Sequence, residues 1–501
     1  MTSRERTSAP PTAVGTRWNA RLWGVLMVVC TVIALDALDV SMVGVALPSI
    51  RAELGVSTST LQWVVSGYVL GYGGLLLLGG RAADLLGRRR VFLVALAVFA
   101  GASLLGGLGS DAGLLIAARF VKGVAAAFTA PAALSIVTTT FPEGPARNRA
   151  ISIFGVFGAS GYSLGLVFSG LMTQVSWRWT FLLPVPIALI TWLAGVRLIP
   201  RAARPDRAGR GYDVLGAVTA AGAALSLVYT VVNAPAVGWT AIRTVAGLAV
   251  AAALATAFVI TELRSRHPLV RLGILRSGAL RRANLGALPF FGAFVSFQFV
   301  VMLYLQSVRG WTPLETALAF LPAALIVAVG SPRTGPIVDR VGTVPLIVGG
   351  VTAHAAGYGL FFLVDERSGY LTSVLPSMIL LGVGFMLAFP ALNIQATAGV
   401  ADHEQGLAGG LLNTSVQIGG AVSLAVVTAV VTANGGGDAS AGALLAGFRP
   451  ALTVVTGLAL GGLAVALTGL YAARRTADRR GGAPATEPAA VPAELLSKEA
   501  A

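Results

Sequence analysis

Four ionisable side chains lie inside long apolar stretches of this sequence. Asp36 and Asp39 interrupt the segment VCTVIALDALDVSMVGVALPSI, and Arg119 and Lys122 interrupt a second apolar segment, residues 113–139. A charged side chain at the centre of a membrane helix costs about 2.5–3.5 kcal/mol on insertion scales, so such residues call for a reason. Residues three apart are neighbours on one face of a helix. Two acids on one helix are therefore expected to match two bases on the other, in register.

Two interpretations of these four charges remain open. They could form neutralising pairs that only hold the two helices together. Alternatively, at least one carboxylate binds and releases a proton, because burial disfavours its charged form whereas a nearby arginine favours it. The second interpretation makes protons the coupling ion and requires neither a metal nor another cofactor. Within it, Asp36 is either a second proton site or an anchor for a cationic substrate.

The elements that must position these charges are long apolar helices. Hydrophobic residues make up 55% of the chain and charged residues 11%, with a mean hydropathy of +0.80. Soluble domains carry roughly 25% charged residues, and apolar runs of about 20 residues are typical of membrane helices. The sequence thus predicts an all-α integral membrane protein, with spans at 22–48, 61–80, 91–109, 113–139, 150–172, 181–199, 213–233, 243–262, 284–308, 315–332, 343–363, 372–393, 405–432 and 449–472.

The positions of the basic residues predict the orientation of these fourteen spans. Loops on the cytoplasmic side of a membrane are enriched in lysine and arginine. Arginines cluster after the second span, after the sixth at 201–210 and after the eighth at 264–282. Both termini, a tail at 1–21 and a disordered tail at 473–501, are therefore expected on the cytoplasmic side of the cell membrane. The net charge of +15 follows from this topology, so no nucleic-acid partner is expected.

The loop after the second span is repeated after the tenth. Both copies share the frame G-x-x-x-D-x-x-G, formed by Gly80, Asp84 and Gly87 in the first and by Gly335, Asp339 and Gly342 in the second. Each copy follows the second helix of a six-span set. The sets are residues 22–200 and 283–472, and the pair at 212–262 is inserted between them. Two like halves suggest a transporter that rocks about a central site.

Several motifs together resemble the major facilitator superfamily, specifically its 14-helix drug:proton antiporter branch. LDVSMVGVALP (38–48) is similar to the first-helix motif of that branch, and RFVKGVAAA (119–127) to its fourth-helix motif. LQWVVSGYVLGYG (61–73), followed by GRAADLLGRRR, matches its second helix and loop. The resemblance covers residues 22–472. It implies the major facilitator fold, two six-helix bundles plus two inserted helices, and export of a drug in exchange for protons.

The resemblance also implies roles for individual residues. It places Asp39 and Arg119 in the machinery that couples protons to transport, whereas Asp36 matches no residue of the family motif. A loop that latches the cytoplasmic side of the two bundles is implied for Gly80, Asp84, Gly87 and Arg88, and for Asp339 and Arg340 in the second half.

This chain departs from the family's pattern at several positions. Lys122 stands where the fourth helix often has glutamine, which adds a second cation. Leu166 and Ser169 replace a proline and a glycine of the fifth-helix motif, so the kink that the proline would bring is in doubt. The glycine spacing of that helix survives, and close helix packing remains expected there. Pro184 stands where asparagine is usual.

Aromatic and amide side chains on the spans that line the family's cavity are the candidates for substrate binding. They are Trp63, Tyr68, Phe154, Phe297, Gln298, Tyr304, Gln306, Asn393, Asn413 and Gln417. Such groups suit a bulky amphipathic molecule that is neutral or carries one positive charge. His354 is either a structural histidine or a proton relay.

Other functions fit the sequence less well. The D-x-x-D spacing of Asp36 and Asp39 is also that of intramembrane prenyltransferases, but no other span offers the second acidic motif that those enzymes need. An importer or facilitator of a small organic metabolite on the same fold remains the alternative. The sequence predicts a monomeric secondary transporter, not an enzyme, whose partners are a small-molecule substrate and membrane lipid. We expect proton-coupled efflux of an antibiotic or a lipophilic cation.

Overall fold

The computed structural model describes residues 18–142, 145–201, 213–265, 268, 270–365, 368–400, 404–434 and 441–481. This part of the chain folds almost entirely into helices and contains no strand. The first half contains α1 (Ala20–Leu54), α2 (Thr58–Leu86), α3 (Arg88–Leu108), α4 (Ala112–Thr140), α5 (Pro145–Val175), α6 (Trp179–Leu182) and α7 (Pro184–Leu198). The inserted pair consists of α8 (Val214–Val237) and α9 (Ile242–Arg264).

The second half begins with the short helix η1 (Leu272–Arg276) and ends with the longest helix of the described chain. Its elements are α10 (Gly278–Leu303), the π-helix η2 (Tyr304–Val308), α11 (Pro313–Val341), α12 (Thr343–Phe361), the π-helix η3 (Tyr370–Val374), α13 (Leu375–Thr397), α14 (Gln405–Asn434) and α15 (Ala441–Gly481). Thirteen of the described helical segments are long and apolar enough to cross a membrane. The prediction of an all-α, multi-pass membrane protein is confirmed.

Helix boundaries follow from capping residues in the sequence. The side chains of Asn19, Ser57 and Asp111 accept hydrogen bonds from backbone N–H groups in the first turns of α1, α2 and α4. Such bonds satisfy donors that the helix itself leaves free. Thr312 and Glu315 cap α11 reciprocally, with two bonds at 3.2 and 2.8 Å. These short polar connections allow successive helices to run antiparallel.

The repeated loop motif sets two equivalent helix breaks. Gly87 separates α2 from α3 with φ +93°, and Gly342 separates α11 from α12 with φ +83°. Only glycine adopts such positive φ values without strain. The last glycine of each G-x-x-x-D-x-x-G copy is therefore the residue at which one helix ends and the next begins.

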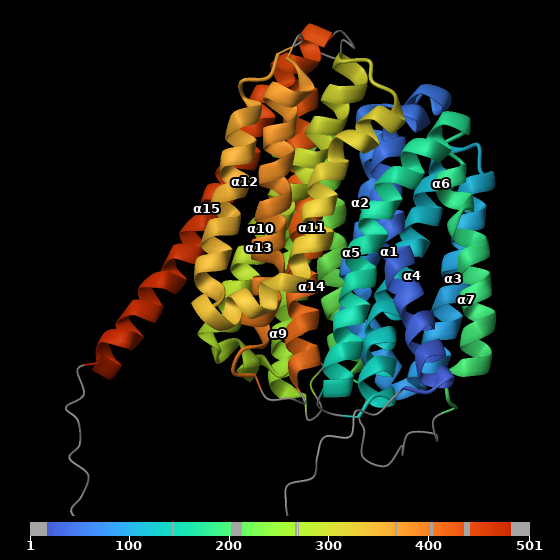
Figure 1. Cartoon of the computed structure of the whole chain (residues 1–501). Coiled ribbons are helices and arrows are strands. Elements are labelled where there is room, and N and C mark those ends of the chain that lie inside the picture. The colour runs from blue at the N-terminus through green and yellow to red at the C-terminus, as the bar shows by residue number, and fades with distance from the viewer. Residues whose placement is uncertain are drawn as a thin grey trace, which may run out of the picture.

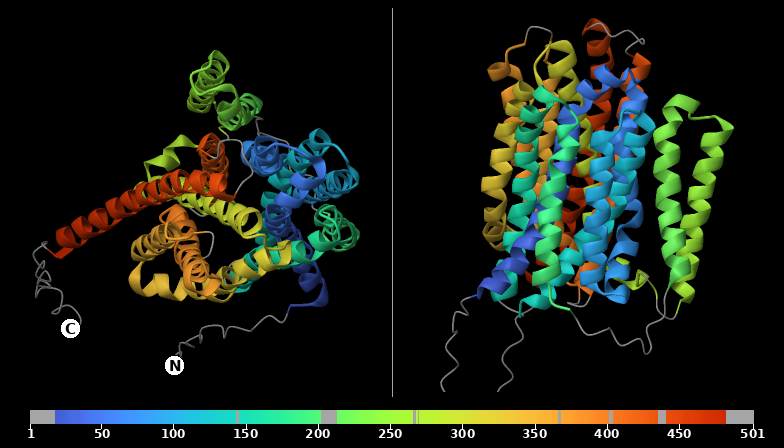
Figure 2. Two further views of the ribbon diagram at one scale, coloured as in Figure 1. Left: turned by 90° about the horizontal axis from the view of Figure 1, so that it is seen from above. Right: turned by 90° about the vertical axis from the view of Figure 1, so that its right-hand side faces the viewer.

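The helices form two bundles side by side, with the inserted pair outside them (Figures 1 and 2). α8 packs against α2 of the first half and against α14 of the second through a small apolar cluster that includes Leu70, Val228 and Ala421. α9 contacts α8 on the outer side, so the pair covers one seam between the bundles. In Figure 1 the end of the bundle at which α1 terminates is uppermost, and these ends are called upper and lower below.

The apolar cores show that the halves meet at the upper end. One cluster contains residues of both halves, including Val43 and Leu61 from the first and Phe297 and Val427 from the second. At the lower end two clusters are separate. One is built from α1, α3, α4 and neighbouring helices of the first half, the other from α10, α12, α13 and α14. Buried apolar contacts thus close the molecule between the halves at its upper end.

Many helices extend several residues beyond the predicted spans, and two further differences concern the last and the sixth span. α15 continues to Gly481, so the expectation that residues 473–481 belong to a disordered tail is wrong. The segment AARRTADRR is rich in alanine and arginine, which favour helix, and contains neither glycine nor proline. Residues 482–501 and 1–17 lie outside the described chain. The sixth span begins earlier than predicted: α6 leads into α7 through Leu183, which has helical dihedral angles, and Trp179–Leu198 is one apolar segment long enough to cross a membrane.

Candidate functional site

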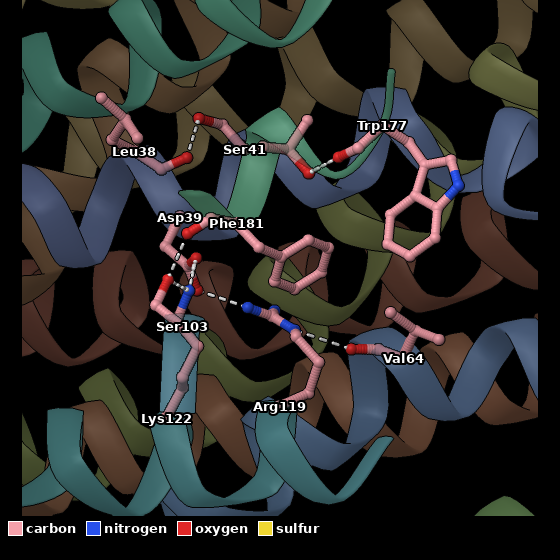
Figure 3. A network of polar contacts seen from close by, with 10 residues as sticks. Leu38, Asp39, Ser41, Val64, Ser103, Arg119, Lys122, Trp177 and Phe181 are labelled. Atoms are coloured by element: carbon pink, nitrogen blue, oxygen red, sulfur yellow. Dashed lines mark hydrogen bonds and ion pairs between the residues drawn. The ribbon is translucent and has the colours of Figure 1, made fainter. Parts of the chain in front are cut away.

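The centre of the first half contains a buried cluster of charges. Asp39 on α1 accepts hydrogen bonds and ion pairs from both Arg119 and Lys122 on α4, one base at each carboxylate oxygen (Figure 3). Asp39 and Lys122 are 0% exposed, and Arg119 is 1% exposed. α1 and α4 run antiparallel, so bases near the start of α4 lie at the depth of an acid in the middle of α1. Hydrogen bonds to a carboxylate from charged donors are roughly twice as strong as neutral ones.

Arg119 is fixed by α2 as well as by Asp39. Its Nε–H donates to the carbonyl oxygen of Val64 at 2.9 Å. The guanidinium carbon also lies 4.5 Å from the centroid of the Tyr68 ring, in cation–π geometry. Three helices, α1, α2 and α4, therefore hold one guanidinium.

Lys122 is enclosed by a hydroxyl and two aromatic rings. Its Nζ donates to the hydroxyl of Ser103 at 2.9 Å, and that hydroxyl donates to the carbonyl oxygen of Phe181 at 2.6 Å. The ammonium lies 4.7 Å from the ring centroid of Phe99 and 5.3 Å from that of Phe181. Cation–π contacts of this kind are strengthened when the cation is desolvated. Lys122 is thus built into the fold as a charged group.

Asp36 has different surroundings from Asp39. It is 5% exposed, and the hydroxyl of Thr129 on α4 donates to it at 3.3 Å. The expected in-register match of two acids with two bases is therefore wrong, since both bases contact Asp39. The side chain of Lys122 is long enough to reach the same carboxylate as Arg119. Thr129, two turns further along the same face of α4, then lies opposite Asp36.

Two tyrosines of α2 complete the surroundings of the acids. Tyr68 and Tyr72 lie one turn apart with ring centroids 5.9 Å from each other, and both are close enough to Asp36 for charge interaction. Tyr68 is 1% exposed, and its hydroxyl has no hydrogen-bond partner among the described residues. A buried hydroxyl without a partner is uncommon and invites a functional explanation. Of these two rings, sequence analysis singled out only Tyr68.

Glycines allow the helices around the cluster to approach closely. A Cβ atom at Gly123 of α4 would lie 2.0 Å from the carbonyl oxygen of Tyr68. On α5, a Cβ at Gly161 would lie 2.3 Å from the carbonyl oxygen of Ala34, and one at Gly165 would lie 2.1 Å from Oγ of Ser41. The close packing expected from the α5 glycine spacing is confirmed. α5 runs as one helix through Leu166, the position of the missing proline.

Three of the substrate candidates lie between the two halves. Gln298 on α10 accepts a hydrogen bond from the hydroxyl of Tyr162 on α5 at 2.7 Å, and Gln306 donates to the carbonyl oxygen of Val45 at 3.2 Å. Gln417 on α14 packs against Gly73 on α2. A Cβ atom built at Gly73 would lie 2.8 Å from the Cβ atom of Gln417. Sequence analysis missed Tyr162, which lies next to Gly161 of the recognised glycine pattern.

The other substrate candidates face elsewhere. Trp63 packs on Tyr229 of the inserted pair, with ring centroids 5.7 Å apart, and Phe154 packs with the lower core of the first half. Phe297 lies in an aromatic cluster with Tyr358 and Phe361. The structure does not bring these side chains together with the charge cluster.

The remaining members of the set occupy separate positions in the second half. The amides of Asn393 and Asn413 donate to carbonyl groups one turn earlier on their own helices, at 2.8 and 3.1 Å. Tyr304 donates to the carbonyl oxygen of Asp365 at 2.7 Å and lines a cavity of about 200 Å³ near the upper end, with Phe361 and Phe448.

His354 makes two hydrogen bonds in the interior of the second half. Its Nε2 lies 3.0 Å from the carbonyl oxygen of Leu381 and its Nδ1 lies 3.2 Å from the hydroxyl of Tyr358. A carbonyl only accepts, so Nε2 carries a proton, and the hydroxyl can then donate to Nδ1. The ring also stacks on Phe290 with centroids 4.8 Å apart. The geometry agrees with a structural histidine.

The two loop motifs lie at the lower end of the molecule. Gly80, Gly87 and Arg88 are partly exposed, and Asp339 and Arg340 are exposed. The side chain of Asp84 lies outside the described part of the structure. Behind the first loop, Arg89 donates to the carbonyl oxygen of Val196 on α7 at 2.7 Å, a contact that sequence analysis missed.

Comparison with known proteins agrees with this architecture. The sequence profile of the Major Facilitator Superfamily matches residues 29–424. The puromycin resistance protein pur8 of Streptomyces alboniger is 38% identical over 430 residues, which cover 83% of this chain and 82% of that protein. The cephamycin export protein CmcT of Amycolatopsis lactamdurans is 36% identical over 84% of this chain and 87% of its own. The crystal structure of the POT family transporter PepTSo, 16% identical, superposes with a TM-score of 0.66 over 92% of this chain and 98% of its own.

Proposed function

This chain belongs to the major facilitator superfamily, and on that premise we propose that it exports a bulky amphipathic organic compound in exchange for protons. Relatives that are at least 36% identical over more than four fifths of this chain are named for puromycin resistance and for cephamycin export. Their names support an antibiotic or a lipophilic cation as the small-molecule substrate. Protons serve as the coupling ion, and the transporter acts as a monomer in the cell membrane without another cofactor.

The orientation of the molecule follows from its basic loops. Arg88 to Arg90 form the first turn of α3 at the lower end, where α1 also begins and α7 ends, and the arginine-rich segment 201–210 follows α7 in the sequence. Cytoplasmic loops are enriched in lysine and arginine, so the lower end faces the cytoplasm together with both termini. The large core that the halves share lies at the upper end, whereas the large cores at the lower end are separate. The conformation is then the one that takes substrate from the cytoplasm or the inner leaflet.

The buried cluster of Asp36, Asp39, Arg119 and Lys122 carries the proposal of proton coupling. Buried charges are costly at this depth. Ion pairs with Arg119 and Lys122 explain why Asp39 is tolerated there, but they do not explain Asp36. In the proposed cycle, a proton from the outer solution reaches the acids on α1 and favours release of substrate to the outside. The loaded carrier turns inward, and substrate that enters from the cytoplasm displaces the proton.

The contacts between the halves are those that must change as the carrier turns. The hydrogen bonds Tyr162–Gln298 and Val45–Gln306 join α1 and α5 to the second half, and the substrate binds beside them on the lower side. At the cytoplasmic surface, Asp84 with Arg88 and Asp339 with Arg340 latch the lower end when it closes. The two turn glycines, Gly87 and Gly342, allow the sharp turns that bring these charges there, and Gly80 lies in the last turns of α2 before the first of them.

Transport into proteoliposomes tests the proposal. Purified protein would be reconstituted into liposomes whose interior is more acidic than the outer solution. Puromycin, lincomycin or tetraphenylphosphonium would then be added outside. Export in exchange for protons predicts accumulation of at least one compound, and abolition of that accumulation by nigericin, which collapses the gradient. Accumulation that persists after the collapse would contradict proton coupling. Accumulation driven only by the opposite gradient would instead indicate an importer.

A further inference from the structure

The two acids of α1 differ in how their charge is neutralised. Asp39 contacts Arg119 and Lys122, and all three are shielded from solvent. With each group ionised, this triad carries a net charge of +1. A proton on Asp39 would leave two cations without a counter-ion in a medium of low dielectric, where unpaired charges are strongly disfavoured. Asp39 is therefore poorly suited to exchange a proton.

Lys122 is the residue that makes the difference. A neutral side chain at this position would leave Asp39 with one cation. Here the lysine ammonium is held by Asp39, by Ser103 and by the rings of Phe99 and Phe181. These contacts favour its charged form and offset the cost of burying it, so Asp39 faces two cations in the cluster.

Asp36 has surroundings that accept both of its protonation states. The Thr129 hydroxyl can donate to a carboxylate and can accept from a carboxylic acid. Tyr68 and Tyr72 face Asp36 from α2, Lys122 faces it from α4 at longer range, and Asp39 faces it from its own helix. The α5 residues that pack nearby, Gly158 and Gly161, carry no ionisable group.

The hydroxyl of Tyr68 is a second observation that points to this position. It is buried beside both acids, and no described residue makes a hydrogen bond with it. A buried donor without a partner costs free energy. The hydroxyl is available to a group that is present in only part of the cycle, such as the substrate or a water molecule that delivers the proton.

We propose that Asp36, and not Asp39, carries the coupling proton in this chain, and that one proton is exchanged in each cycle. This proposal rests on the proposed proton coupling. A proton from the outer solution bonds to a carboxylate oxygen of Asp36 and later leaves to the cytoplasm when substrate binds. Asp39 stays ionised between its two cations throughout.

The charge of the cluster then determines for which substrates the exchange moves no net charge across the membrane. The four residues carry +1 with Asp36 protonated and zero with Asp36 ionised. A singly charged cation beside ionised Asp36 restores the total of +1. Exchange of one proton for one monocation therefore moves no net charge across the membrane, whereas exchange for a neutral compound moves one.

Infrared difference spectroscopy tests the assignment without any substrate. Acid-minus-alkaline spectra would be recorded for the purified wild-type protein, Asp36→Asn, Lys122→Gln and the double variant. A buried carboxylic acid gives a C=O band at higher frequency than a solvated one. Glu404→Gln serves as the control, because Glu404 pairs with Arg271 away from the cluster. All spectra are recorded in a Glu262→Gln background, because Glu262 on α9 is also a buried carboxylate, 4% exposed.

The proposal predicts one buried band in the wild type, its loss in Asp36→Asn and its persistence in Glu404→Gln. Lys122→Gln should add a second band, because Asp39 then retains a single cation and becomes able to take up a proton. The double variant should again show one band. A wild-type band that survives in Asp36→Asn, or the absence of any buried band in the wild type, would overturn the assignment.

The same variants separate this proposal from the proposed function. If accumulation in proteoliposomes does not respond to the pH gradient while the buried band of Asp36 is present, proton coupling fails and the assignment of the titrating acid holds. If transport depends on the gradient equally in the wild type and in Asp36→Asn, coupling holds and the assignment fails. If the double variant regains the coupling that Asp36→Asn has lost, Asp39 serves as the proton site when Lys122 is absent. Lys122 would then be the reason that Asp36 has this role in the wild type.

Discussion

Asp36 and Asp39 lie three residues apart on α1, yet Asp39 contacts two buried cations whereas Asp36 accepts a hydrogen bond from Thr129 at 3.3 Å. One face of one helix thus presents two carboxylates with different partners. The difference arises on α4, where Arg119 and Lys122 converge on the same carboxylate. Asp39 therefore holds α1 and α4 together, whereas the carboxylate of Asp36 is available to bind and release a proton.

The loss of stability should be larger when the shared acid is removed than when either base is removed. Asp39→Asn leaves two buried cations unpaired, and breaking a buried ion pair by removing one partner costs about 3–5 kcal/mol. Lys122→Gln leaves the pair of Asp39 with Arg119 intact and should cost less. Unfolding of the detergent-solubilised proteins, followed by tryptophan fluorescence, measures both. Equal losses would argue against an Asp39 shared by two cations.

Substrate affinity should fall as the pH falls. If substrate displaces the proton from Asp36, lowering the pH populates the protonated form that competes with binding, and the apparent Kd rises by at most about tenfold per pH unit. At higher pH, where Asp36 is ionised, the Kd should be constant. Equilibrium binding of tetraphenylphosphonium, which itself does not titrate, measures this dependence. In Asp36→Asn the dependence should vanish, and a dependence that remains would require a different titrating group.

Gly165 should not tolerate a side chain, because α5 packs there directly on α1. A Cβ atom would lie 2.1 Å from Oγ of Ser41 and 2.6 Å from the carbonyl oxygen of Leu38. Overpacking of this kind typically costs about 1–3 kcal/mol, and it would displace the turn of α1 that carries Asp39. Gly165→Ala should lower both thermal stability and transport.

Gly155→Ala provides the matched control on the same helix, since no atom lies within 4 Å of a Cβ atom at that position. It should leave the melting temperature and the transport rate close to the wild-type values. If both variants behave alike, the close contact between α1 and α5 does not limit either property.

The hydrogen bond between Tyr162 and Gln298 should favour the conformation in which the upper end is closed. A hydrogen bond contributes about 0.5–1.5 kcal/mol net, so Tyr162→Phe should raise the population open at that end by about two- to tenfold. Val43 is buried in the core that the halves share. In a Cys30→Ser background, the rate at which a water-soluble maleimide labels Val43→Cys reports that population.

Tyr229→Phe, on the exposed face of α8, is the matched control for this measurement. It should leave the labelling rate unchanged. A rate that is equally unaffected by Tyr162→Phe would mean that the apolar core alone keeps the upper end closed.

Several features of this protein were readable from the sequence. Apolar runs of about 20 residues predicted the helices, because hydropathy is a local property of the chain. The capping residues Asn19, Ser57 and Asp111, which the structure revealed, also act within a few residues along the chain. The repeated glycines at 87 and 342 marked equivalent helix breaks for the same reason. Motifs such as LDVSMVGVALP indicated the family, which the match over residues 29–424 confirms. The cost of burying charge singled out the four ionisable residues.

Which side chains meet was decided by the tertiary structure. Sequence spacing placed Asp36 and Asp39 on one face, but it did not show that a long, flexible Lys122 would share Asp39 with Arg119. Trp63 was expected in a cavity and instead faces the inserted helix α8, whereas Tyr162 was missed and reaches Gln298 across the halves. Helical periodicity is local, so it fixes which residues share a face. The contacts of that face depend on how helices far apart in the sequence pack, and packing is decided by the whole bundle.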